Sequence, residues 1–140
     1  MMTGMRGGLV TESFARIGLR AVPGATQMAE GQRRSVSRLL SSIARGLGPA
    51  SSVRAIAEVA AIPLLRALGY AIASRVDSAS ECRIAATAGD RAVIVVVAPW
   101  GASSDAGRRG TLASGIGADV RWCIHINGAS LRIVDAHRTW

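Results

Sequence analysis

The residues that most constrain the fold form one uninterrupted apolar run, RAVIVVVA, at positions 91–98. Valine and isoleucine favour extended backbone because their branched Cβ restricts the first side-chain torsion. A strand exposed on one face alternates apolar and polar residues, but no polar residue follows Arg91 in this run. Such a strand is typical of the centre of a sheet that is covered on both faces. We therefore expect an α/β domain with helices on both sides of the sheet.

Helical patterns precede this strand and shorter strand patterns surround it. Apolar residues recur at helical spacing from Ser35 until glycines near Gly46 stop them. A second helix should begin at Ser51 or Ser52 and be bent or interrupted at Pro63. We expect strands over residues 70–76, 81–88, 91–98, 120–126 and 130–135, a helix over 105–116, and an Asn127-Gly128 hairpin. The resulting order, α-α-β-β-β-α-β-β, predicts an α/β (α+β) fold with a central mixed sheet of about five strands.

The chain is long enough for one domain with its own core. Residues 1–32 are rich in glycine, methionine and small polar residues, so we expect a mobile arm there and a single domain over 33–140. Two cysteines, Cys82 and Cys123, are too few for a disulfide framework and should be buried, reduced thiols. Without a signal-peptide core or an apolar run of ~18 residues, we expect a cytoplasmic protein with no membrane partner.

The charge of the chain is carried by arginine alone. All 17 basic residues are arginine, against 9 acidic residues, which gives a net charge of +8. The absence of lysine excludes mechanisms that need a lysine amine, and the positive charge favours a polyanionic partner such as DNA. Trp100, Arg108, Arg109 and Arg121 are our candidate DNA contacts. The alternatives are that Trp100 packs against the sheet and that the arginines are dispersed, solvated side chains.

Other motifs favour structural over catalytic interpretations. Gly115-Ile116-Gly117 stands where a helix should end, so we interpret it as helix termination and not as a nucleotide loop. His125, His137 and Cys123 provide too few ligands for a zinc site, so we expect no metal and no cofactor. No serine lies in a motif that places a nucleophile.

Three segments carry a family resemblance: LGPASSVRAIAEVAAIPLLRALGY, VIVVVAPWG and GIGADVRWCIHINGASLRIVDAHRT. Together they resemble the N-terminal domain of bacterial type IIG restriction–modification proteins, which join a PD-(D/E)xK endonuclease-like module to an N6-adenine DNA methyltransferase. The resemblance covers roughly residues 46–140. It implies a restriction-endonuclease-like core, DNA as a partner, and a methyltransferase domain located downstream or on a separate chain. Because the chain ends directly after the last segment, we expect the product of a truncated gene, a fragment or a standalone relic.

The sequence departs from this family at the catalytic positions. The family uses an Asp on the second strand and Glu-x-Lys on the third, where the carboxylates hold a metal that activates water. Aligning the turn Pro99-Trp100-Gly101 places Val96 at the glutamate position and Ala98 at the lysine position. Glu81 and Asp90 cannot rebuild such a site alone, and no Asn-Pro-Pro-Tyr methyltransferase loop occurs.

We therefore expect no enzymatic activity. The leading hypothesis is a catalytically inactive nuclease-like domain that contributes DNA contact or domain packing. One alternative is a protein-interaction or dimerisation module with no role at nucleic acid. Another is an active enzyme of a different class, for which the sequence offers no identifiable acid–base pair.

Overall fold

The computed structural model describes residues 30–103, 105 and 108–137. The chain divides between Arg33 and Arg34 into two units, and all but four of the described residues belong to the second. Our interpretation of residues 1–32 as an arm falls mostly outside the described residues. Residues 30–32 already belong to the first described helix, so the predicted helix start at Ser35 is five residues too late.

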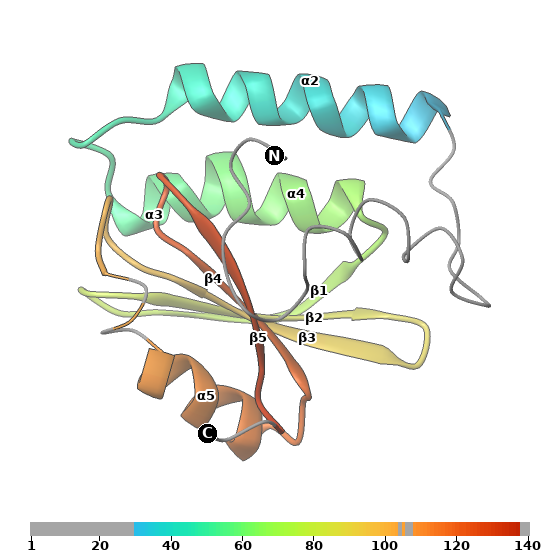
Figure 1. Cartoon of the computed structure of the whole chain (residues 1–140), viewed down its shortest axis with the longest axis vertical. Helices are drawn as coiled ribbons and strands as arrows, with labels where there is room; N and C mark the ends of the chain where they lie inside the picture. Colours follow the sequence, from blue (N-terminus) through green and yellow to red (C-terminus); the bar gives the residue numbers. More distant parts are fainter. Residues whose placement is uncertain (1–29, 104, 106–107, 138–140) are drawn as a thin grey trace, which may run out of the picture. The chain divides into compact units, whose positions relative to one another are not determined.

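The described elements follow the predicted order when the three segments of the second helix are counted together (Figure 1). The helical segments are α2 (Glu30–Gly46), α3 (Val53–Ile56), the π-helical turn η2 (Ala57–Ala61), α4 (Ile62–Ala67) and α5 (Arg108–Gly117). The strands are β1 (Ala71–Asp77), β2 (Cys82–Ala88), β3 (Arg91–Val97), β4 (Trp122–Ile126) and β5 (Leu131–Asp135).

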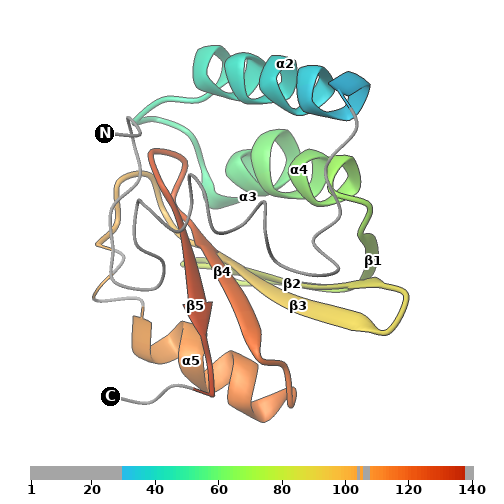
Figure 2. The ribbon, with the colours of Figure 1, turned by 45° about the vertical axis from the view of Figure 1, so that its right-hand side comes forward.

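The strands form one mixed sheet in the order β1-β2-β3-β4-β5. Neighbouring strands are antiparallel except for β3 and β4, which are parallel. A parallel pair needs a crossover connection, and α5 provides it between β3 and β4. Helix α5 lies on one side of the sheet, whereas α3 and α4 lie on the other (Figure 2). The predicted five-stranded mixed sheet flanked by helices is therefore confirmed.

Strand β3 is buried on both faces, as its sequence predicts. Val93, Val95 and Val97 belong to the core cluster formed with the α3–α4 segment. Ile94 and Val96 belong to a second cluster on the α5 side. Because successive side chains of a strand point to opposite faces of the sheet, this one valine-rich run contributes to two hydrophobic cores.

The interruption expected at Pro63 takes the form of the π-helical turn that precedes it. Ser52 caps the helix, since its side chain accepts a hydrogen bond of 3.1 Å from the Ala55 N–H. At the end of η2, the Ile62 N–H donates to the Ala57 carbonyl, five residues back. The wider turn lies just before the proline, in the turn that its ring would crowd, and the chain continues as α4.

The two cysteines are buried and unbonded, as expected. Cys82 belongs to the core on the α3–α4 side and Cys123 to the core on the α5 side, so the sheet separates them. Within the described parts of the chain, no helix is long and apolar enough to cross a membrane.

Candidate functional site

Val96, the position that the resemblance assigns to a catalytic glutamate, is closed to water. Val96 is only 4% exposed and packs in the α5-side core with Ile94 and Cys123. Ala98 follows the end of β3, is partly buried, and donates its backbone N–H to the Ile126 carbonyl at 2.8 Å. Val96 and Ala98, which the resemblance assigns to the Glu-x-Lys motif, are therefore both parts of the packed sheet.

The two carboxylates that flank β2 lie at opposite ends of the β2–β3 hairpin. Glu81 precedes the pair Cys82–Val97, while Asp90 stands in the turn beyond the pair Ala88–Arg91. At ~3.4 Å per residue, the intervening strand separates these ends by about 20 Å. One metal ion cannot bind both carboxylates.

A row of four registered residues crosses the sheet at Val96. Arg83 of β2 pairs with Val96, Val96 with His125 of β4, and His125 with Arg132 of β5. Residues paired in this way project from the same face of a sheet, here the face covered by α5. Arg83 forms an ion pair with Glu81 at 2.6 Å, and Arg132 forms one with Asp105 at 2.5 Å. Both guanidinium groups in the row are therefore already bound to carboxylates.

His125 is the unusual member of this row. It is 2% exposed, and its Nδ1 has no hydrogen-bond partner among the described residues. Burial lowers the pKa of the imidazole, and Arg132 lowers it further, while Glu81 acts in the opposite direction. The ring is accordingly neutral at pH 7. The sequence favoured a core or edge position for His125 over a role as a metal ligand. Its burial became visible once the β4 register was known.

The possible metal ligands of the sequence do not meet at one point. Cys123 and His125 share the α5-side face of β4, but His137 is exposed beyond the end of β5. Within residues 30–103, 105 and 108–137, no group of three or more His, Cys, Asp or Glu side chains is placed to hold a metal ion.

The lowered pKa of His125 makes stability depend on pH. The unfolded chain titrates near pH 6.5, while the folded chain takes up this proton only at lower pH. As pH falls through 6.5, the unfolded state binds more protons, and the free energy of unfolding decreases by at most ~1.4 kcal/mol per pH unit. In urea denaturation, the free energy of unfolding of the wild type should decrease between pH 7.5 and 5, and that of His125→Gln should decrease less. Equal pH dependence in both proteins would contradict the assignment.

Trp100 lies under the β4–β5 hairpin. Its ring packs against the core on the α3–α4 side, and a Cβ built on Gly128 would approach its Cε3 to 2.5 Å. The side chain of Asn127 fixes the neighbouring loop by donating to the Ala102 carbonyl at 2.7 Å. Gly128 has φ +78°, which glycine adopts without steric cost. The Trp100 ring is thus a packing element at this end of the sheet.

Arg121 is held by a buried carboxylate. Its Nη2 lies 3.0 Å from Oδ2 of Asp135, whose side chain is 2% exposed, and its guanidinium stacks 5.1 Å from the Trp122 ring centre. Asp135 also accepts the His137 N–H at 3.1 Å. These contacts fasten the start of β4 to the end of β5. The positive charge of Arg121 is therefore largely compensated within the fold.

The four candidate DNA contacts do not form one surface. Trp100 follows the C-terminal end of β3, and Arg121 precedes the N-terminal end of β4. Because these strands are parallel, the two residues lie at opposite edges of the sheet. Arg109 is exposed near the start of α5. Arg108 is the first residue of that helix, and its side chain lies outside the described part.

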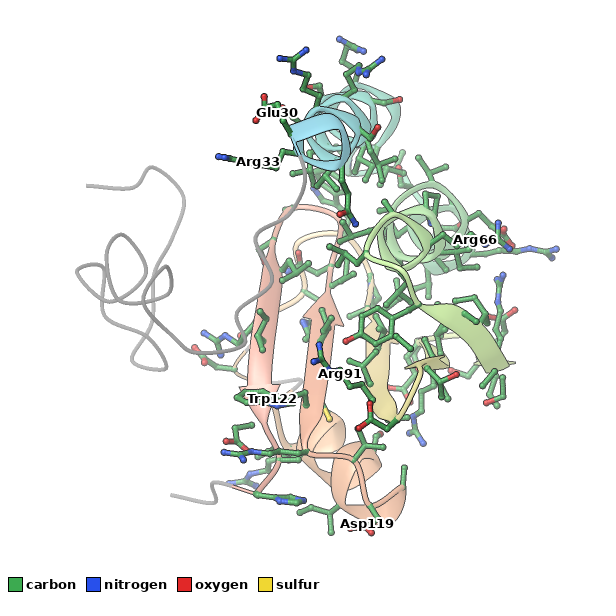
Figure 3. All side chains as sticks on the ribbon, turned by 90° about the vertical axis from the view of Figure 1, so that its right-hand side faces the viewer. Glu30, Arg33, Arg66, Arg91, Asp119 and Trp122 are labelled. Carbon is green, nitrogen blue, oxygen red and sulfur yellow. The ribbon has the colours of Figure 1, made fainter. Side chains whose placement is uncertain are left out.

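The described helices leave part of the sheet face on the α3–α4 side exposed. Trp122, Leu131 and Ile133 are between 40% and 51% exposed on strands β4 and β5. Their register with Ile124 and Ile126 places them on the face that carries the α3–α4 core. Figure 3 shows Trp122 on this part of the sheet, well below α4. A contiguous exposed apolar group of this kind is typical of an interaction surface.

Comparison with known proteins finds no match to this chain among family models, curated proteins or solved structures.

Proposed function

We propose that this chain is a catalytically inactive, nuclease-like domain of a DNA restriction–modification protein of the bacterial cytoplasm. Its remaining role is DNA contact or packing against a methyltransferase domain. The observation that carries the proposal is the burial of Val96 at the position of the family's catalytic glutamate. The order of one helical layer, three antiparallel strands, a helix and a parallel strand supports it, because the nuclease core has the same order.

The surrounding charges support loss of catalysis as well. Hydrolysis by such a site needs carboxylates that hold a divalent cation beside the scissile phosphate. Glu81 is bound to Arg83, and Asp90 lies at the far end of the hairpin. The chain has no lysine to place beside them. The row through Val96 is a packed and charge-compensated part of the sheet.

A nuclease assay tests this proposal. The full chain is incubated with supercoiled plasmid and Mg²⁺ or Mn²⁺, and we expect no cleavage above the protein-free control. Glu81→Gln and Asp90→Asn serve as matched variants. Metal-dependent cleavage that either variant abolishes would overturn the proposal.

Domain packing is a second candidate role, favoured by the exposed apolar group of Trp122, Leu131 and Ile133. Ionic strength separates the two roles, since phosphate contacts weaken steeply with salt and apolar docking does not. Packing is supported if the chain shows no salt-dependent affinity for duplex DNA at 50 mM salt, and if Ile133→Arg abolishes its association with an adenine methyltransferase domain.

A further inference from the structure

The two edges of the sheet differ in the features that prevent strand pairing. Strand β1 forms one edge and β5 the other, and within the described residues neither has a neighbouring strand on its outer side. An open edge strand pairs with another chain unless a bulge or charged side chains prevent it. Strand β1 has both features, since its register shifts between Ile72 and Ser74, and Arg75 forms ion pairs with Glu58 and Asp77. Strand β5 pairs with β4 in an unbroken register.

The backbone groups of Leu131 and Ile133 point away from β4, toward this open edge. Antiparallel strands alternate between residue pairs that exchange hydrogen bonds and pairs that do not. The Asn127 N–H donates to the Ser130 carbonyl at 3.2 Å, which makes theirs a bonded pair. Counting along the ladder from it, Leu131 and Ile133 belong to pairs that do not exchange bonds. Their N–H and C=O groups therefore face outward, where no described residue binds them.

The side chains along this edge are apolar on the face opposite α5. Leu131 and Ile133 are 46% and 51% exposed, and Trp122 of β4 is 40% exposed on the same face. Ile133 pairs with Ile124, which packs against the core on the α3–α4 side. The edge thus offers unpaired backbone groups and apolar side chains to one partner, which is the combination that binds an added strand.

Strand β5 is complementary to a second copy of itself. Oligomers of a single chain are usually related by a two-fold axis, and an axis at Ile133, the middle residue, pairs all five residues of β5 with those of the second copy. The two Ile133 residues then face each other and exchange two hydrogen bonds through their outward groups. In this register, Arg132 faces Val134 of the second copy. Moving the axis to Arg132 would place two like charges opposite each other, which destabilises a strand pair.

The neighbouring helices leave room for this pairing. Helix α5 packs chiefly on β4, between β3 and β5. The two copies of β4 would lie three strand spacings apart, about 14 Å at ~4.8 Å each. An α-helix with its side chains is ~10–12 Å wide, so both copies of α5 fit on their face of the joined sheet. On the other face, η2 and α4 pack chiefly on β3 and β1.

We propose that β5 joins two copies of this chain into a symmetric dimer with one continuous sheet. A row of four isoleucines, Ile124 and Ile133 of each copy, then crosses the junction on the α3–α4 side. The proposal does not rest on the nuclease-like origin of the domain. It does use the apolar group that is a candidate for domain packing, so a dimer and a docked methyltransferase domain exclude each other there. Pairing through one short strand makes a small interface, so we expect a dissociation constant of about 10–100 μM.

A strand from a different protein is the competing partner for this edge. A second copy is favoured because its own β5 supplies a strand of equal length, with outward backbone groups and an apolar side chain at the centre of the pairing. The two partners respond differently to substitutions of Ile133, because only in the dimer does this residue face itself.

The test places like or opposite charges at the two-fold axis. Ile133→Lys and Ile133→Glu each put two equal charges opposite each other, whereas an equimolar mixture of the two variants puts opposite charges there. Val76→Lys is the matched control, since Val76 is a 65% exposed, β-branched residue of the other edge strand. Surface substitutions of this kind change stability little, so circular dichroism should show the same secondary structure in all variants.

Sedimentation equilibrium of the full chain over ~5–500 μM measures the association. The mass of the wild type and of Val76→Lys should rise from 14.5 kDa toward twice this value. Ile133→Lys or Ile133→Glu alone should raise the dissociation constant at least about 30-fold, the loss typical of a central interface residue. The mixture should associate about 10-fold more tightly than either variant alone. Higher salt should strengthen the wild-type dimer, because it screens the repulsion between two chains of charge +8.

The dimer is wrong if the wild type remains a monomer at the highest concentration; the nuclease-like proposal, which plasmid cleavage tests, would then be unaffected. It is also wrong if Val76→Lys weakens the association as much as Ile133→Lys, since added charge alone would explain the loss. If the wild type dimerises but the mixture associates no better than either variant, residue 133 does not face itself and the β5 junction fails.

Discussion

Replacing Val96 by glutamate should strongly destabilise the domain and not create a nuclease site. The side chain of residue 96 lies in the core between β3 and α5, where it is 4% exposed. The effective cost of burying an ionised carboxylate is several kcal/mol. The neighbouring Arg83 cannot offset this cost, because its guanidinium is half exposed and bound to Glu81. We expect a loss of about 3 kcal/mol or more, and a fall in Tm of more than about 10 °C.

Two variants separate charge from size in this experiment. Val96→Gln introduces a side chain of the same shape as glutamate without the charge, and Val96→Ala leaves only a cavity. Burial raises the pKa of a carboxyl group, so the folded glutamate variant keeps its proton to higher pH than the unfolded chain. Relative to Val96→Gln, the glutamate variant should therefore lose stability as pH rises above ~4.3. Equal unfolding free energies of the two variants at pH 7 would mean that water reaches the position.

The central strand and the order of elements could be predicted because their signals are local. The valine-rich run has no polar face to expose, so it predicts a strand that is buried on both faces. Strand β3 is buried in this way. The Asn127-Gly128 hairpin also lies where expected, although its ends differ from the prediction. The last pair of the ladder is Ile126–Leu131, so the loop has four residues, and Asn127 Oδ1 accepts bonds from both Ala129 N–H and Ser130 N–H.

The candidate site was less predictable because its contacts join distant parts of the chain. Trp100, Arg109 and Arg121 were all candidate DNA contacts, but sequence spacing does not show which edge of the sheet each residue occupies. The partner of Arg121 is 14 residues away and that of Arg132 is 27 residues away. Pairings of this kind depend on strand register and loop path.

Gly115 is another residue whose role depends on contacts between distant parts of the chain. The Gly-Ile-Gly motif was interpreted as helix termination, and α5 does end at Gly117, followed by Asp119 with φ 52°. Gly115, however, lies inside the helix and is buried. A Cβ on this residue would meet Sγ of Cys123 and lie 2.8 Å from Cβ of Ala136. The glycine is required by close packing of α5 on the β4–β5 pair.

Substituting alanine at Gly115 should therefore destabilise the domain, while the same change at Gly110 of this helix should stabilise it. Overpacking a core costs ~1–3 kcal/mol, and the backbone carbonyl of Val120, 3.1 Å from the added Cβ, has little freedom to move. At Gly110 an added Cβ meets no atom within 4 Å, so alanine contributes only its helix propensity, ~1 kcal/mol. In urea denaturation, the free energy of unfolding should be lower than that of the wild type for Gly115→Ala and higher for Gly110→Ala.

Cys123→Ala should recover part of the stability that Gly115→Ala loses, because it removes the sulfur atom that the new methyl group meets. A Gly115→Ala protein as stable as Gly110→Ala would show that α5 does not pack on β4 at this residue.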